Sequence, residues 1–133
     1  MHTASATETA VLGVDPGRRI GLAWVASDGR LLRVEVVDAA ALAHLEAPEG
    51  AAIALGDGTG SHAVRALLEG SGRAVELVDE RATSEQGRLL YWRDRPARGW
   101  RRWIPVGLRP PPDLLDGYAA YAIALRWLAR SSG

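Results

Sequence analysis

The chain has 133 residues and a mass of 14.2 kDa, a length typical of one domain. Hydrophobic residues make up 47% and charged residues 24%, a balance that excludes a disordered or fibrous protein. The formal net charge is zero, and the absence of cysteine excludes disulfides, thiolate zinc sites and a cysteine nucleophile. We expect residues 1–8 to be a disordered N-terminal segment and residues 9–133 to form a single domain.

The first third of the domain predicts an antiparallel meander. Apolar runs are expected to form strands at Thr9–Asp15, Ile20–Ser27 and Arg30–Val37. The first run ends in the turn sequence Asp-Pro-Gly, and Asp28-Gly29 between the next two runs is typical of a tight hairpin. Strands joined by such short turns pair antiparallel.

Helices and strands alternate in the rest of the chain. The expected elements are a helix at Asp38–Ala47, a strand at Ala51–Leu55, a helix from Thr59 or Ser61 to about Glu69, a strand at Ala74–Asp79, a helix from Thr83 to about Arg93, a loop at Pro96–Pro112 and a helix from Asp113. A meander followed by this alternation implies an α/β fold. We expect a five-stranded mixed sheet, antiparallel across the first three strands and parallel beyond, flanked by helices.

The basic residues, all sixteen of which are arginine, are unevenly distributed. Eight arginines and only two acidic residues lie between Arg81 and Arg109, giving this stretch a local charge of +6. Arginine contacts phosphate and exposed tryptophan stacks on unpaired bases, although tryptophan can also pin a loop to its fold. The contacts to nucleic acid expected from this stretch are Arg81, Arg98, Trp100, Arg101, Arg102 and Trp103.

Acidic residues occur where predicted strands end and where the last helix begins. Asp15 ends the first strand, and Asp79-Glu80 follows a later one. Asp113 and Asp116 are three residues apart, on one face of a helix that is apolar nearly all round. Each of these acids could instead be an ordinary turn or helix-capping residue.

Asp57 and two arginines extend this group. Asp57 lies in Gly56-Asp57-Gly58-Thr59-Gly60, a strand-to-helix turn that could cradle phosphate but lacks the lysine of a P-loop. Arg18 and Arg19, beside Asp15, could reach a phosphate or simply belong to a solvated turn. His44 and His62 are isolated and are expected to be surface or packing residues.

A mixed sheet can bring the acidic positions together in one site. Clustered carboxylates without cysteine or histidine suit Mg²⁺ or Mn²⁺, which prefer oxygen ligands. Two such ions can activate water and stabilise the leaving oxygen in phosphodiester cleavage. The sequence therefore predicts a nuclease whose basic loop attracts the polyanion.

Three segments, VLGVDPGRRIGLAWVASDG, LVDERATS and DLLDGYAAYAIALRWL, resemble the signature blocks of the YqgF/RuvX family. The similarity spans nearly the whole chain in the same order. It implies an RNase H-like fold related to the RuvC Holliday-junction resolvases. It also implies that Asp15, Glu80 and Asp116 are the metal-binding catalytic acids. Asp113 is similar to one of the paired C-terminal acids of RuvC, which takes another acid from its fourth strand, so Asp57 is an alternative to Glu80.

The resemblance favours an RNA substrate, with processing of the 5′ end of pre-16S ribosomal RNA as the expected role in ribosome biogenesis. Cleavage of branched DNA of the RuvC type is the alternative. The Leu55–Thr59 segment is closer to the related domain of the transcription accessory protein Tex, so a non-catalytic nucleic-acid-binding domain is a further alternative. The N-terminus lacks a signal peptide and the apolar run Leu114–Leu128 is short and charged, so we expect a cytoplasmic monomer or homodimer with no membrane partner.

Overall fold

The computed structural model describes residues 8–45, 47–48, 50–70, 72–79, 86–87, 89–90, 93 and 115–132, without the side chains of 115, 116, 131 and 132. In chain order the elements are β1 (Thr9–Asp15), β2 (Ile20–Ala26), β3 (Leu31–Val37), the 3₁₀ helix η1 (Ala39–His44), β4 (Ala52–Gly56), α2 (Ser61–Gly70), β5 (Glu76–Val78) and α4 (Leu115–Ser132). The bounds of β1 are those predicted from the sequence. The other strands begin or end within one residue of their predicted bounds, apart from β5, which begins two residues later.

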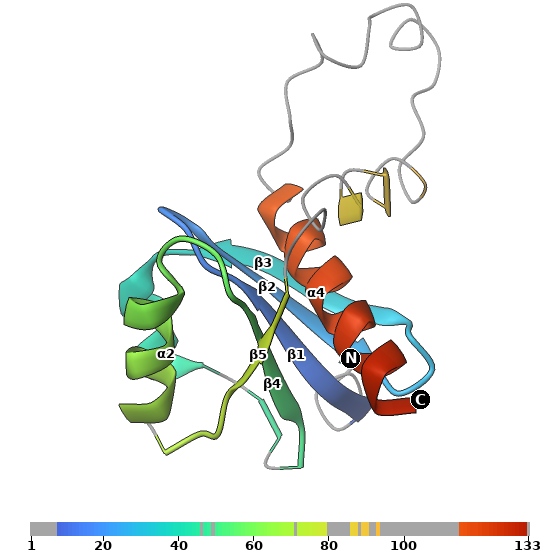
Figure 1. Ribbon diagram of the computed structural model, residues 1–133, viewed down its shortest axis with the longest axis horizontal. Coiled ribbons are helices and arrows are strands. Elements are labelled where there is room, and N and C mark those ends of the chain that lie inside the picture. The colour runs from blue at the N-terminus through green and yellow to red at the C-terminus, as the bar shows by residue number, and fades with distance from the viewer. Residues whose placement is uncertain are drawn as a thin grey trace, which may run out of the picture.

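The five strands form one sheet in the order β3-β2-β1-β4-β5 (Figure 1). β1 and β3 both pair antiparallel with β2, whereas β4 pairs parallel with β1 and with β5. The predicted mixed sheet is therefore confirmed. Because β1, β4 and β5 run in the same direction, their carboxyl ends meet at one edge of the sheet.

Alternating side chains of the sheet build two apolar cores, one on each face. On one face, α4 packs through residues such as Ala120 and Ile123 against Val11, Ala54 and Val78. On the other face, α2 and η1 contribute to a second core, which includes Leu12 and Val14 of β1. Figure 1 shows α2 and α4 on opposite sides of the sheet. Burial on both faces explains why β1 and β2 are continuous apolar runs.

The predicted Asp28-Gly29 hairpin joins β2 to β3. Gly29 has φ +92°, a left-handed conformation that glycine adopts without a steric penalty. The Gly29 N–H donates to the Ala26 carbonyl at 2.9 Å, and the Ala26 N–H donates to the Arg30 carbonyl at 2.9 Å. The Asp28 carboxylate accepts from the Arg30 N–H at 3.0 Å, and this bond lowers the pKa of Asp28.

The helix predicted at Asp38–Ala47 is shorter in the structure and is of the 3₁₀ type, at Ala39–His44. The Asp38 carboxylate caps it by accepting from the Ala41 N–H at 3.3 Å. Leu45 is already extended, with φ −65° and ψ 128°. Proline disfavours the helical conformation in the residue before it, and the chain is already extended at Leu45 ahead of Pro48, so only a short 3₁₀ helix forms.

Two predicted regions lie largely outside the described residues. Of the helix expected from Thr83 to about Arg93, residues 86–87, 89–90 and 93 are described and are helical. Residues 1–7, the loop at Pro96–Pro112 and the helix start at Asp113 fall outside the description, while Glu8 is placed and pairs with Arg30 at 2.9 Å. Among the described helices, none has the length and apolarity needed to cross a bilayer.

Candidate active site

Acidic residues gather where the parallel strands end. Asp15 is the last residue of β1, Asp57 follows β4, and Asp79 follows β5. The Asp57 N–H donates to the Val78 carbonyl at 3.0 Å, which ties the ends of β4 and β5 together. This edge is where open α/β sheets bind ligands, and Asp15, Asp57 and Asp79 all lie on it.

Asp15 projects on the face of the sheet that α4 covers. Residues two apart on a strand share a face, and Val11 packs in the core beneath α4, whereas Leu12 and Val14 pack in the opposite core. Asp15 is two and four positions after Gly13 and Val11, so it lies on the same face as they do, and it is half-buried. Its carboxylate is therefore held at the rim of the α4 face.

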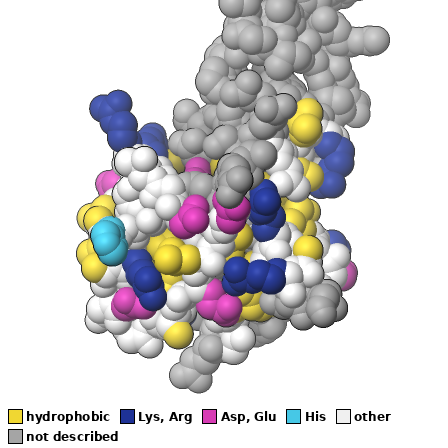
Figure 2. Space-filling view, in the orientation of Figure 1, with side chains coloured by type: hydrophobic (Ala, Val, Ile, Leu, Met, Phe, Trp, Pro, Cys, Tyr) yellow, Lys and Arg dark blue, Asp and Glu magenta, His cyan; other side chains and the backbone are white. Residues whose placement is uncertain are grey.

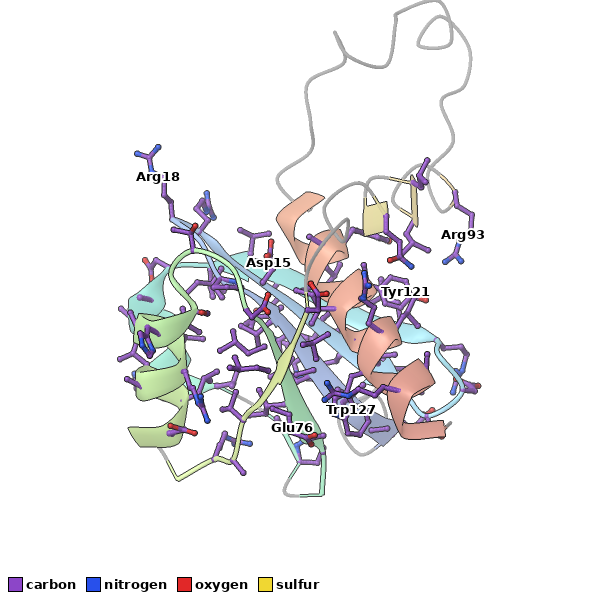
Figure 3. All side chains as sticks on the ribbon, in the orientation of Figure 1. Asp15, Arg18, Glu76, Arg93, Tyr121 and Trp127 are labelled. Carbon is purple, nitrogen blue, oxygen red and sulfur yellow. The ribbon has the colours of Figure 1, made fainter. Side chains whose placement is uncertain are left out.

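The first turn of α4 lies at the same end of the sheet as Asp15 (Figure 3). The helix comes closest to β1 at Gly13, where an added side chain would overlap the Ala120 carbonyl oxygen. Further along α4, the Tyr121 hydroxyl donates to the Gly29 carbonyl at 2.7 Å, in the hairpin at the amino end of β1. The helix therefore points its N-terminus toward the carboxyl end of β1.

Asp116 is the second residue of α4, one turn before Ala120. That turn extends about 6 Å along the helix axis, and Asp15 lies about 7 Å beyond Gly13 along β1. The backbone thus brings the positions of Asp15 and Asp116 to one end of the molecule. The side chain of Asp116 lies outside the described residues, as do Glu80 and Asp113.

Asp57 shares the edge with Asp15 but not the face. Ala54 packs in the core beneath α4, so Gly56 has the same parity and Asp57 has the opposite one. The bond from the Asp57 N–H to Val78 continues the β4–β5 ladder by one residue, so the alternation still applies there. Asp57 is exposed, and its parity directs it toward the α2 side.

Arg18 and Arg19 lie in the exposed turn between β1 and β2, next to Asp15. The Arg19 guanidinium donates to the Val36 carbonyl at 3.5 Å, whereas Arg18 extends away from the fold (Figure 3). Acidic and basic side chains are interspersed on the surface seen in Figure 2. The other predicted nucleic-acid contacts, Arg81, Arg98, Trp100, Arg101, Arg102 and Trp103, lie outside the described residues.

The predicted donor set fits a hard divalent cation because every member is a carboxylate. Within the part of the chain that the structure describes, no three His, Cys, Asp or Glu side chains form a group that could hold a metal ion. Of the predicted ligands, only Asp15 and Asp57 have described side chains. His44 and His62 are both exposed, which agrees with their expected surface placement.

Sequence reasoning missed the close packing of α4 at Gly13. A glycine in the interior of an apolar strand is a known signal for close approach of another backbone. That signal is present in the TAVLGVD run. Gly13 therefore could have been identified as the place where a second element presses on β1.

The sheet order, with three antiparallel strands followed by parallel ones and helices on both faces, defines an RNase H-like fold. A solved structure of RuvC from T. thermophilus in complex with a Holliday junction substrate is similar to this chain, with a TM-score of 0.53 and 21% identity. The similarity covers 92% of this chain and 95% of that chain. It confirms the predicted RNase H-like fold, and the assignment to the YqgF/RuvX family stays a prediction. No family model matches the chain, and no curated protein matches it either.

Proposed function

We propose that this protein is a divalent-metal-dependent nuclease that hydrolyses phosphodiester bonds, with RNA as the preferred substrate. The observation that carries the proposal is the position of Asp15. It lies at the carboxyl edge of the sheet, on the α4 face, at the end where the helical turn containing Asp116 begins. The RuvC-like fold supports the same reading.

Asp15, Glu80 and Asp116 would hold Mg²⁺ or Mn²⁺, with Asp113 as a further ligand. When bound, such an ion lowers the pKa of a coordinated water and neutralises charge on the phosphate. Asp15 contributes a carboxylate whose position is fixed by β1 and whose half-burial limits competing solvation. Arg18, exposed beside it, would attract the phosphate backbone of the substrate.

Two observations favour different substrates. The three sequence blocks that resemble YqgF/RuvX favour RNA, whereas the similar RuvC structure contains a Holliday junction, which favours branched DNA. We propose RNA processing first, because those blocks include the strand-end acids themselves. Branched DNA is the second candidate.

A cleavage panel tests the function and the substrate together. Labelled single-stranded RNA, single-stranded DNA and a four-way DNA junction are incubated with Mn²⁺, Mg²⁺ or EDTA. We expect cleavage of RNA that requires metal and is lost in Asp15→Asn. Asp28→Asn is the matched control, because Asp28 is also a strand-end carboxylate but lies in the β2–β3 hairpin at the opposite end of the sheet.

Each outcome of the panel has a distinct meaning. Cleavage of the junction alone would move the assignment to a resolvase. Binding of nucleic acid without cleavage in either metal would show a non-catalytic binding domain and refute the proposal. The role of Arg18 is measured separately, since Arg18→Ala should reduce the salt dependence of binding by about one unit of slope.

A further inference from the structure

Glycines occur where the N-terminal part of α4 meets its neighbours. At Gly13 in β1, an added Cβ would overlap the Ala120 carbonyl oxygen and would lie 3.0 Å from the Ala124 Cβ. At Gly117 in α4, an added Cβ would overlap Cγ2 of Val34 in β3. The backbone of α4 therefore approaches the sheet more closely here than it could if both positions carried side chains.

A second surface presses on the same turns of the helix. A Cβ at Gly87 would lie 2.6 Å from the Ala119 nitrogen and 2.7 Å from the Tyr118 carbonyl oxygen. Gly87 is itself buried. The beginning of α4 is therefore in close contact with the sheet and also with Gly87.

The rest of α4 is fixed by polar contacts. The Tyr121 hydroxyl bonds to the Gly29 carbonyl at 2.7 Å, and the Arg130 guanidinium donates to the Leu77 carbonyl at 3.3 Å. Arg130 also lies 3.5 Å from the Glu76 carboxylate. A push from the sheet near Gly117 would consequently tilt the first turn of the helix about these anchors, and that turn contains Asp116.

We propose that Gly13 and Gly117 are positioning residues that set the height of the first turn of α4 above the end of β1, and so the spacing between Asp15 and Asp116 as ligands of one divalent ion. This inference rests on the proposed function. Mg²⁺ requires near-ideal octahedral geometry with oxygen ligands at about 2.0–2.1 Å, and a functional constellation tolerates displacements of only about 0.5 Å. A methyl group that lifts the helix therefore weakens the metal site.

The test is calorimetric titration of Mn²⁺ into the full chain. A second substitution, which removes the atom that the added methyl group meets, should restore the affinity. Gly117→Ala places a methyl against Val34 Cγ2, and Val34→Ala removes that atom. In the double variant the nearest remaining atoms would be the Glu35 carbonyl oxygen at 3.3 Å and the Val34 Cβ at 3.6 Å, so a shift of only a few tenths of an ångström accommodates the methyl group. We expect Mn²⁺ affinity to fall at least about tenfold in Gly117→Ala and to return to within about threefold of wild type in the double variant.

Gly13→Ala gives the opposite control, because its obstruction is backbone. Truncating Ala124 to Gly cannot relieve the overlap with the Ala120 carbonyl, so affinity should stay low in Gly13→Ala/Ala124→Gly. If Gly117→Ala does not fold, Val34→Ile enlarges the same contact from the sheet side and leaves the helix sequence unchanged. Circular dichroism of every variant separates loss of fold from loss of the site.

The inference is overturned if folded Gly117→Ala, or folded Val34→Ile, binds Mn²⁺ with wild-type affinity. It is also overturned if the double variant stays as weak as Gly117→Ala while Val34→Ala alone binds normally. Failure of the proposed function gives a different result. Wild type and Asp15→Asn would then bind Mn²⁺ equally or not at all, and wild type would cleave no substrate.

Discussion

Replacing Gly13 with alanine perturbs the close contact between β1 and Ala120 of α4. The added Cβ meets the Ala120 carbonyl oxygen, and because that atom is backbone, no rotamer change can relieve the overlap. Overpacking a dense core costs about 1–3 kcal/mol, while the lower entropy of the unfolded chain offsets about 0.4–1 kcal/mol. We expect a net loss of about 1–2 kcal/mol in the free energy of unfolding. With an unfolding entropy of about 2.1 cal/mol/K per residue, Tm falls by about 4–7 °C.

Gly70→Ala is the matched substitution in open space. Gly70 ends α2, and nothing lies within 4 Å of a Cβ built there. Alanine favours a helix over glycine by up to about 1 kcal/mol, so we expect Tm to be unchanged or to rise by up to about 4 °C. Thermal melts followed by circular dichroism, together with urea titrations, give both values. Equal shifts in the two variants, or a rise in Tm for Gly13→Ala, would refute the close packing of α4 on β1.

Three further substitutions probe other contacts. Tyr121→Phe removes the hydroxyl that donates to the Gly29 carbonyl and should lower the free energy of unfolding by about 1 kcal/mol, which urea titration measures; an unchanged midpoint would mean that water replaces the bond. Asp28→Asn removes a carboxylate whose pKa the Arg30 backbone N–H, and then its side chain, lower from the usual 3.8. A lowered pKa stabilises the fold above the pKa of the unfolded state, so the Tm difference between wild type and Asp28→Asn should be present at neutral pH. It should decrease as the pH falls below about 4 and through the lowered pKa of the folded state. Asp57→Asn should leave Mn²⁺ affinity within about threefold of wild type, and a loss as large as that of Asp15→Asn would place Asp57 among the ligands.

Local signals predicted the meander well. β1 has its expected bounds because a run buried on both faces ends at the Asp-Pro-Gly turn. The hairpin could be predicted because Asp28 accepts from the following backbone while Gly29 adopts a positive φ, and both preferences are local. The mixed sheet could be predicted from the short turns of the meander and from the alternation of helices and strands after it.

Tertiary contacts determined what the sequence did not show. Ala74 and Val75 continue the apolar run before β5, yet Val75 is buried in the core on the α2 face and β5 pairs with β4 only from Glu76. The alanine-rich composition of Ala39–His44 favours an α-helix, but the chain becomes extended at Leu45 ahead of Pro48 and only a 3₁₀ helix forms. The role of Gly13 depends on a helix about a hundred positions later in the chain, which no local pattern specifies.

Asp57 and Glu80 are alternative candidates for the second metal ligand beside Asp15, and the alternation of side chains along β4 bears on Asp57. Ala54 and Val78 pack beneath α4, the face on which Asp15 projects. Asp57 is three positions after Ala54, so its side chain lies on the face opposite to that of Ala54 and Asp15. Glu80 itself lies outside the described residues, so its place beside Asp15 stays a proposal. The alternation therefore separates Asp57 from Asp15 and leaves it for the α2 side, where its backbone already joins the ends of β4 and β5. A carboxylate on the far face cannot share an ion with Asp15 unless the chain turns back over the sheet edge, so Glu80 stays the proposed ligand on the strength of the sequence resemblance.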